Sequence, residues 1–368
     1  MIVETKNEIY ETKLNLIQIE LTGYCNMNCK HCRAKNEPKK FFDEEKYNLI
    51  MELIKMESGN DFKLTLSGGE PFLHKKILEY IEIAKTNDIS SLVVTTNGSL
   101  VKRKHLEYIN NLNFDNFIIQ VSLDSLIENV HDDFRGFNGA FRICDNLLDK
   151  IKKYSKINSS IRMTINEETI CQMEEMVQYA ISKECKIIGF GSIIPFGKAE
   201  DCSMSLNKEN KLKFLTEVVR LNLKYGDKIE VVTEDPLKSN IKNSPWNICN
   251  GCSEDEIIFG GCTAGIDSLN IQSNGIITPC SMIKEAILDL NECQTLNDLI
   301  KNYQNSHLVK KLFERKFYGK CAKCKKKYLC GGCRASAKGR TNDLFGTDES
   351  CWLDENDLWF SCAYRKLW

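Results

Sequence analysis

Two features that would mark a membrane or secreted protein are missing from this 368-residue chain. No window of the sequence stays apolar over the length that a membrane-spanning helix requires. The first residues, MIVETKNEIYETK, are polar and contain no apolar core of a signal peptide. The sequence therefore predicts a protein of the reducing cytoplasm, with no membrane partner.

An excess of charge of either sign is also missing. The chain has 50 Lys and Arg residues against 51 Asp and Glu residues. Nucleic acids attract proteins with a clear basic excess, so the composition predicts no nucleic-acid partner. Neither internal repeats nor low-complexity tracts are present, and the 42% of hydrophobic residues is ordinary for a globular protein. The length exceeds what one core usually serves, which favours two domains.

Cysteine is the residue type in clear excess, with 18 in the chain. In a reducing compartment this number indicates metal or iron–sulfur binding rather than disulfides. Cys25, Cys29 and Cys32 follow an apolar run at 16–21 with the spacing Cys-x3-Cys-x2-Cys, which predicts a strand leading into a metal-binding loop. Three thiolates leave one iron of a four-iron cluster open to a substrate or cofactor. The alternatives are a zinc site, which favours four ligands, or three unrelated thiols.

Strand-like and helix-like segments alternate along the first half of the chain. We expect strands at 16–21, 62–66, 91–96, 117–123, 161–165 and 186–194. The segments between them predict helices at 43–56, 74–86, 104–111, 140–154 and 168–183. This alternation is typical of a parallel α/β architecture, but it does not distinguish a partial barrel from an open sheet. A helix at 207–224 and a strand at 229–233 then precede a linker-like stretch near 234–243.

Polar or glycine-containing segments follow several of the expected strands. They are SGGEP (67–71), TTNG (95–98), QVSLDS (120–125) and Asn166. Ligand sites of parallel α/β proteins lie at the carboxyl ends of the strands. The two adjacent glycines of SGGEP would let the backbone approach a ligand closely. These segments are therefore the candidate binding site.

The last third of the chain holds a second cysteine field. Cys262 and Cys280 flank a predicted hairpin with strands at 268–272 and 276–278, joined by a two-residue turn at Asn274-Gly275 in which both positions favour positive φ. The remaining members of the field follow the hairpin: Cys321-x2-Cys324-x5-Cys330-x2-Cys333, and then Cys351. Because Cys-x2-Cys pairs also suit zinc, a pair of zinc knuckles is the alternative.

The two cysteine fields together resemble the radical SAM enzymes with a C-terminal SPASM extension. The resemblance includes the first three cysteines, the GGEP segment and the spacing of the second field, which departs in having two residues instead of three before Cys333. It implies an N-terminal extension (1–14), a partial (β/α)6 barrel (15–234) and a SPASM domain (235–368) with two auxiliary cluster sites. It also implies reductive cleavage of S-adenosylmethionine (SAM) to a 5′-deoxyadenosyl radical, which removes a hydrogen atom from the substrate.

The resemblance further implies the ligands. Cys25, Cys29 and Cys32 would hold the SAM-binding [4Fe–4S] cluster. The SAM-binding residues would be Tyr24, His31, Gly68, Gly69, Glu70, Pro71, Thr96, Asn97, Ser122, Asp124, Arg135 and Asn166. One auxiliary [4Fe–4S] cluster would be held by Cys321, Cys324, Cys330 and Cys351, and the other by Cys262, Cys280, Cys333 and either Cys252 or Cys249, or with one open iron. For Asp124 and Arg135 the alternative roles are a helix cap and a surface ion pair.

The expected activity is the oxidative modification of a peptide or protein, such as a thioether or carbon–carbon crosslink in a ribosomally made peptide. Sulfatase maturation is disfavoured because the family members with that activity carry an acidic residue where this chain has Ser281. A haem-pathway enzyme acting on a tetrapyrrole is the alternative, since the CGGCRA stretch resembles those members too. An iron–sulfur electron carrier or redox sensor without catalysis, and a zinc-dependent nucleic-acid binder, are the alternatives of other classes.

The expected partners follow from the same resemblance. They are a peptide or small protein substrate and an electron donor of the flavodoxin or ferredoxin type. Five lysines, which either dock that donor or form a solvated face, crowd the second field: Lys320, Lys323, Lys325, Lys326 and Lys327. Only 24 residues precede Cys25, so recognition of a leader peptide would need a separate binding protein or another surface.

Overall fold

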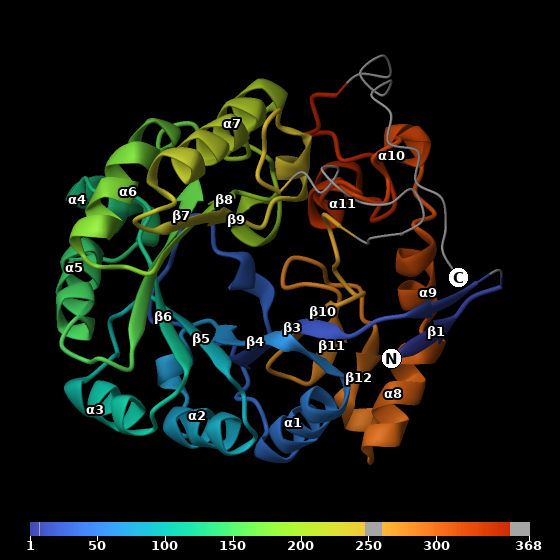
Figure 1. Cartoon of the computed structure of the whole chain (residues 1–368), viewed down its shortest axis with the longest axis horizontal. Coiled ribbons are helices and arrows are strands. Elements are labelled where there is room, and N and C mark those ends of the chain that lie inside the picture. The colour runs from blue at the N-terminus through green and yellow to red at the C-terminus, as the bar shows by residue number, and fades with distance from the viewer. Residues whose placement is uncertain (7, 247–259, 354–368) are drawn as a thin grey trace.

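Ten strands form one sheet in the computed structural model, which describes residues 1–6, 8–246 and 260–353 (Figure 1). Their order across the sheet is β12-β11-β10-β3-β4-β5-β6-β7-β8-β9, and β3 to β9 pair in parallel. Their bounds are β3 (Leu14–Thr22), β4 (Ser58–Gly68), β5 (Ser91–Thr96), β6 (Asn116–Ser122), β7 (Asn158–Ile165), β8 (Ile187–Ser192), β9 (Glu230–Thr233), β10 (Ser268–Ile271), β11 (Ile276–Thr278) and β12 (Leu288–Asp289). A separate hairpin contains β1 (Ile2–Glu4) and β2 (Ile9–Glu11).

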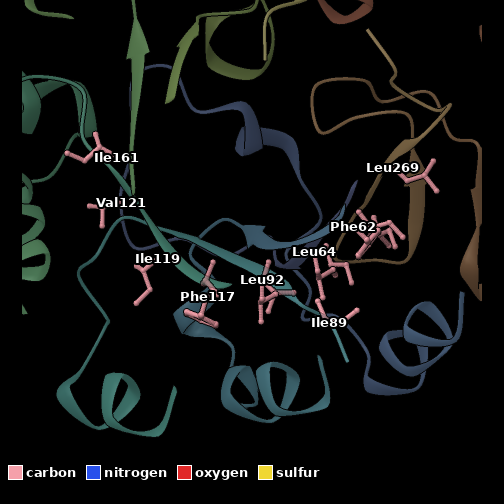
Figure 2. Packing of buried hydrophobic residues seen from close by; sticks show 14 of the residues in the cluster. Phe62, Leu64, Ile89, Leu92, Phe117, Ile119, Val121, Ile161 and Leu269 are labelled. Carbon is pink, nitrogen blue, oxygen red and sulfur yellow. The ribbon is translucent and has the colours of Figure 1, made fainter. Parts of the chain in front are cut away.

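Helices cover the outer face of the parallel strands (Figure 1). They are α1 (Glu44–Glu57), α2 (Ile77–Thr86), α3 (Arg103–Asn111), α4 (Glu128–Arg135), α5 (Ala140–Ile151), α6 (Met173–Ser182) and α7 (Lys208–Tyr225). Figure 2 shows apolar side chains between the sheet and this outer layer, among them Leu64, Leu92, Phe117 and Ile161. Burial of this apolar row stabilises the sheet and the helices together. The expected partial α/β barrel is confirmed, and each of the six predicted strands is present.

The opposite side-chain row of the same strands faces the inside of the barrel and is largely polar. Side chains alternate along a strand, so the neighbours of the apolar outer residues face inward. The polar members of this row are Gln18, Glu20, Thr65, Ser67, Thr95, Gln120, Ser122, Ser160, Arg162 and Thr164. Some bond to each other between strands, as Gln18 Nε2 does to Ser67 Oγ (2.7 Å). Strands of parallel sheets are usually apolar on both faces, so this polar interior indicates a ligand site.

The C-terminal part of the chain extends the same sheet. Strand β10 pairs in parallel with β3, with Ser268 opposite Leu16, and β11 and β12 continue beyond it. Four helices pack at this end: α8 (Leu296–Asn305), α9 (His307–Glu314), α10 (Gly319–Lys323) and α11 (Arg334–Thr341). The predicted cysteine-flanked hairpin is therefore in direct contact with the first barrel strand. Among the described helices, none is long and apolar enough to cross a membrane.

The turn of this hairpin differs from the prediction. Gln272 N donates to Ile276 O (2.9 Å), which leaves a three-residue loop at 273–275 instead of a two-residue turn. Only Gly275 has a positive φ, +93°. Three-residue hairpin loops end on a left-handed residue, which glycine provides, and Asn274 instead accepts a hydrogen bond from Ile276 N through Oδ1 (3.3 Å).

Candidate functional site

The loop that carries Cys25, Cys29 and Cys32 leaves β3 at its carboxyl end and is anchored by three other segments. Four backbone hydrogen bonds do this: Gly69 N to Thr22 O (2.7 Å), Glu70 N to Tyr24 O (2.8 Å), Lys30 N to Phe134 O (2.9 Å) and Lys198 N to Cys32 O (3.0 Å). The partners follow β4, belong to α4 and follow β8, respectively. Cys29 is buried and Cys25 is the most exposed of the three. The loop is therefore held at four points, while Cys25 stays accessible.

The adjacent glycines of the GGEP segment fit against this loop. A Cβ on Gly69 would lie 2.1 Å from Tyr24 O, and one on Gly68 would lie 2.3 Å from Thr22 O. Gly68 also has a φ of +128°, which L-residues with a side chain rarely adopt. We expected these glycines to make room for a ligand. The structure shows that they first make room for the backbone of the cysteine loop.

The Glu70 carboxylate joins the segments that follow β4 and β5. It is fully buried and accepts hydrogen bonds from Thr96 Oγ1 (2.8 Å), Asn97 N (2.8 Å) and Phe72 N (3.2 Å). Asn97 in turn donates from Nδ2 to Asn26 Oδ1 (3.0 Å), next to Cys25. Burial raises the pKa of Glu70 to about 7. Both oxygens of the carboxylate thus accept hydrogen bonds from the protein itself, and these bonds fix the segment after β4 relative to the segment after β5.

This raised pKa gives a pH-dependent stability that Glu70→Gln should remove. Between the usual value of 4.5 and about 7 the folded chain keeps a proton that the unfolded chain releases. The free energy of unfolding should therefore fall as pH rises through this window, by about 3 kcal/mol in total, and stay level above it. Urea unfolding of both proteins at pH 5 to 8 measures this. A wild-type stability that keeps a constant offset from the variant at every pH would contradict it.

Asp124 and Arg135 form a buried ion pair beside the cysteine loop. Arg135 Nε lies 2.6 Å from Asp124 Oδ2, and both residues are buried. Arg135 Nη1 also lies 3.9 Å from Cys29 Sγ, and Asp124 Oδ1 accepts from Thr164 N (2.9 Å). Burial acts to raise the pKa of Asp124, but Arg135, the two nearby histidines and the hydrogen bond from Thr164 N together outweigh it and hold the pKa below its usual value. The alternative of a surface ion pair is therefore wrong, and a positive charge stands next to a cysteine sulfur.

The remaining predicted SAM-binding residues are distributed unevenly. His31 stacks on Phe134 with ring centroids 4.2 Å apart, and burial lowers the pKa of His31 to about 4, which keeps the ring neutral. Tyr24 is exposed and packs against Phe41 at the loop. Pro71 begins a short 3-10 turn after the GGEP glycines, and Ser122 ends β6 on the inner row. Asn166 points its Oδ1 to its own turn, where it accepts from Thr169 N (2.9 Å).

Seven cysteines of the C-terminal part lie in two groups, as their mutual electrostatic effects show. In the first group burial raises the pKa of Cys280 to about 12, and the nearby Cys262 adds to this shift. Burial and then Cys262 also raise the pKa of Cys333. Cys262, Cys280 and Cys333 are thus neighbours. Cys252 and Cys249, the proposed fourth ligands, lie outside the described residues.

The second group contains Cys321, Cys324, Cys330 and Cys351. Burial raises the pKa of Cys351 to about 11, with Cys321 contributing, and Cys321 also contributes to the raised pKa of Cys324. The pKa of Cys330 is raised by burial and by Cys351. In the described part of the chain no three Cys, His, Asp or Glu side chains converge closely enough to hold a single metal ion.

Buried polar residues that the sequence did not reveal connect these two groups. Asp348 accepts hydrogen bonds from Cys333 N (2.8 Å), Ser336 Oγ (2.8 Å) and Ser350 Oγ (2.7 Å). Arg334 points Nη2 toward Cys321 Sγ (3.6 Å), and it donates to two backbone oxygens of the next turn. Arg334 could have been found from its position in the CGGCRA stretch, directly after Cys333. Nothing in the sequence indicated a role for Asp348.

Two charged residues of the inner barrel row were also missed. Glu20 is buried on β3 and accepts from Arg33 Nη1 (2.8 Å), which also donates to Ser281 O (3.3 Å) beyond the hairpin. Arg162 lies on β7. Both could have been found from the sequence, because a charged residue among the apolar residues of a predicted strand indicates a functional position. The contact through Arg33 joins the segment after the three cysteines to the end of the C-terminal hairpin.

The chain combines a partial α/β barrel, a three-cysteine loop after the first barrel strand and a small cysteine-rich C-terminal part. The same combination can be sought in known proteins. Residues 19–180 match the model of the Radical SAM superfamily. The subtilosin biosynthesis protein AlbA of Bacillus subtilis is 23% identical over 92% of this chain and 70% of its own length. The AdoMet-dependent heme synthase of Methanosarcina barkeri is 25% identical over 91% of this chain and 95% of its own length.

Solved structures show the same fold. SuiB of Streptococcus suis, in its complex with the precursor peptide SuiA, superposes with a TM-score of 0.73 at 17% identity, over 93% of this chain and 76% of that chain. This likeness covers 93% of the chain, so it extends into the cysteine-rich C-terminal part. Residues 19–180 therefore form a radical SAM domain, and the comparisons support a radical SAM enzyme that resembles peptide maturases. This family implies a [4Fe–4S] cluster and SAM.

Proposed function

We propose that this radical SAM enzyme oxidatively modifies a peptide, with a crosslink or thioether in a ribosomally made peptide as the expected product. The observation that carries the proposal is the junction of the two cysteine fields. Strand β10 lies beside β3, and Arg33 bridges Glu20 to Ser281. A substrate in the polar barrel interior would thus lie between the first cysteine loop and the C-terminal thiols. AlbA, a bacteriocin biosynthesis protein, and SuiB, seen with a precursor peptide, support a peptide substrate.

The side chains present suit the cofactors that the family implies. Cys25, Cys29 and Cys32 would hold the cluster and leave one iron for SAM, and Arg135 puts a positive charge next to Cys29. When bound, the cluster and SAM supply a radical that removes a hydrogen atom from the substrate. The surrounding contacts to SAM would come from Tyr24, His31, Gly68, Gly69, Glu70, Pro71, Thr96, Asn97, Ser122, Asp124, Arg135 and Asn166. Because Glu70 is satisfied within the protein, we assign it a positioning role there.

The two sets of C-terminal cysteines are the basis for proposing two auxiliary [4Fe–4S] clusters. These clusters would take up an electron from the substrate. One would be bound by Cys321, Cys324, Cys330 and Cys351, the other by Cys252, Cys262, Cys280 and Cys333. We keep the division into an N-terminal extension (1–14), a barrel (15–234) and a SPASM domain (235–368) as part of this proposal. A flavodoxin or ferredoxin-type donor would dock at the lysines near Cys324, and a separate protein would bind the leader peptide.

A tetrapyrrole substrate is the second candidate. The haem synthase of Methanosarcina barkeri is 25% identical to this chain over 95% of its own length, which supports this candidate. A polar barrel interior suits the carboxylates of a tetrapyrrole as well as a peptide. The bacteriocin-related match and the SuiB fold favour the peptide.

The deciding experiment is an intact-mass measurement. The enzyme is co-expressed anaerobically with each short peptide encoded beside its gene, and the Cys29→Ala variant is the matched control. A loss of about two mass units that depends on Cys29 would establish a two-electron oxidation of the peptide. Peptides of unchanged mass and without deuterium uptake, together with consumption of an added haem precursor, would contradict the peptide proposal and favour the tetrapyrrole.

A further inference from the structure

Arg162 occupies an unusual place in the barrel. It lies on β7 between Ile161 and Met163, which are fully buried, so alternation directs its side chain to the inside. It pairs across β6 with Ser122 and across β8 with Gly189. Its side chain keeps 29% of its surface exposed. A guanidinium group therefore reaches the polar interior and stays accessible there.

The neighbouring strand β8 is shaped around this side chain. A Cβ on Gly191 would lie 2.1 Å from Arg162 Nη2, and one on Gly189 would lie 3.4 Å from Nη1. Any larger residue at 191 would force the guanidinium away. In this structure the two glycines make the space for Arg162. Two small residues thus hold a charged group in a defined position.

Arg162 stands apart from the other arginines in its lack of a close partner. Each of the others in the described ranges has a hydrogen-bond or ion-pair partner at 2.8 Å or less: Arg33, Arg103, Arg135, Arg142, Arg220, Arg315, Arg334 and Arg340. Within those ranges, Arg162 has only Glu234 Oε2, at 3.9 Å, and the Glu234 side chain is 82% exposed. Exposed pairs of this kind are weak. The donors of a well-placed guanidinium are therefore left for another group.

We propose that Arg162 binds a carboxylate of the substrate inside the barrel. Guanidinium matches carboxylate geometry with two parallel hydrogen bonds, and such pairs are strong where water is partly excluded. This inference rests on the proposed function, in which the barrel holds the substrate. The carboxylate is that of an acidic residue or chain end in a peptide, or that of a tetrapyrrole.

Protection of Arg162 from an arginine-selective reagent tests this without turnover. The cluster-loaded enzyme is treated with phenylglyoxal, and the modified residues are mapped by mass spectrometry. The probes are N-acetylglutamate methylamide and, as the uncharged match, N-acetylglutamine methylamide. We expect the acid to slow labelling of Arg162 at least about threefold and the amide to leave it unchanged. Arg103, exposed and paired with Glu107, is the internal control whose labelling neither probe changes.

Variants and further probes separate the remaining interpretations. Arg162→Gln should weaken binding of the acid probe at least about tenfold, Arg162→Lys less so, and Glu234→Gln should strengthen it by removing the competing carboxylate. Protection by a porphyrin tetracarboxylate at far lower concentration than by the acid probe would identify the tetrapyrrole as the source. Labelling of Arg162 does not depend on turnover. The labelling result can therefore be interpreted even if the intact-mass experiment finds no peptide modification.

Three outcomes would overturn the assignment. An Arg162 that does not react in the free enzyme is closed to any substrate. Equal labelling with and without the acid probe means that no carboxylate binds there. Protection by SAM alone, as complete as by the probe, would place Arg162 in the cofactor site instead.

Discussion

Replacing Asp124 with alanine is expected to lower the free energy of unfolding by about 3–5 kcal/mol. The change removes the only acidic partner within 2.6 Å of the buried Arg135 among the described residues. A guanidinium without a counter-charge in a buried site must either lose its hydration uncompensated or pull water into the fold. Thr164 N also loses its acceptor, which adds the cost of an unsatisfied donor.

Urea unfolding of the variant measures this loss, and two further proteins make it specific. The Lys30–Asp133 pair lies nearby, but its side chains are 53% and 68% exposed, so Asp133→Ala should cost less than about 1 kcal/mol. The double variant Asp124→Leu/Arg135→Met removes both charges and should recover most of the stability. If Asp124→Ala and Asp133→Ala lowered the free energy of unfolding equally, the buried ion pair would stabilise the fold no more than the exposed one.

The strands of the barrel could be predicted because their apolar rows are strong local signals. The run at 91–96 gave the bounds of β5 as observed, since the apolar residues Leu92, Val93 and Val94 lie between turn signals. The polar inner row was visible in the same runs, at Gln18 and Glu20 and at Arg162. It was not assigned to the inside of a barrel, because the alternation of strands and helices did not distinguish a partial barrel from an open sheet.

Helix α4 could not be predicted from its pattern. Its sequence, ENVHDDFR, is mostly polar, and it buries His131 and Arg135 along with Phe134. Its side chains are stabilised by partners from distant segments, such as Asp124 for Arg135, rather than by an apolar stripe. It ends at Gly136, whose Cβ would lie 2.5 Å from Asn28 O in the cysteine loop. Only the folded arrangement reveals why this short polar segment is helical.

The site shows the same division between local and distant information. The grouping of the C-terminal thiols was implied by the resemblance to a known family and not by closeness in sequence, since Cys333 lies near Cys262 rather than grouping with Cys330. The contact of the GGEP glycines with the cysteine loop could not be predicted, because their partner, the backbone at Thr22 and Tyr24, lies some forty-five residues earlier in the printed sequence. Residues such as Asp348 and Arg334 act through contacts with backbone groups, and no spacing rule describes those.

Replacing Asp348 with alanine should have the largest effect at the C-terminal end. The carboxylate is fully buried and accepts from Cys333 N, Ser336 Oγ, Ser350 N and Ser350 Oγ at 2.7–3.1 Å. It thereby ties Cys333 at the start of α11 to the turn that leads into Cys351. Losing it leaves several buried donors unsatisfied, with an expected cost of about 3–5 kcal/mol.

The Asp348→Ala substitution should also lower the iron content of the protein. Cys333 and Cys351 belong to different thiol groups, so one substitution should disturb both proposed auxiliary sites, while the loop of Cys25, Cys29 and Cys32 keeps its anchors. The iron content should then fall by roughly two thirds while SAM cleavage persists and substrate oxidation stops. Asp201→Ala is the matched control, since its carboxylate also accepts from a serine but lies at the surface. Full iron content in Asp348→Ala would mean that the two thiol groups are held independently of this carboxylate.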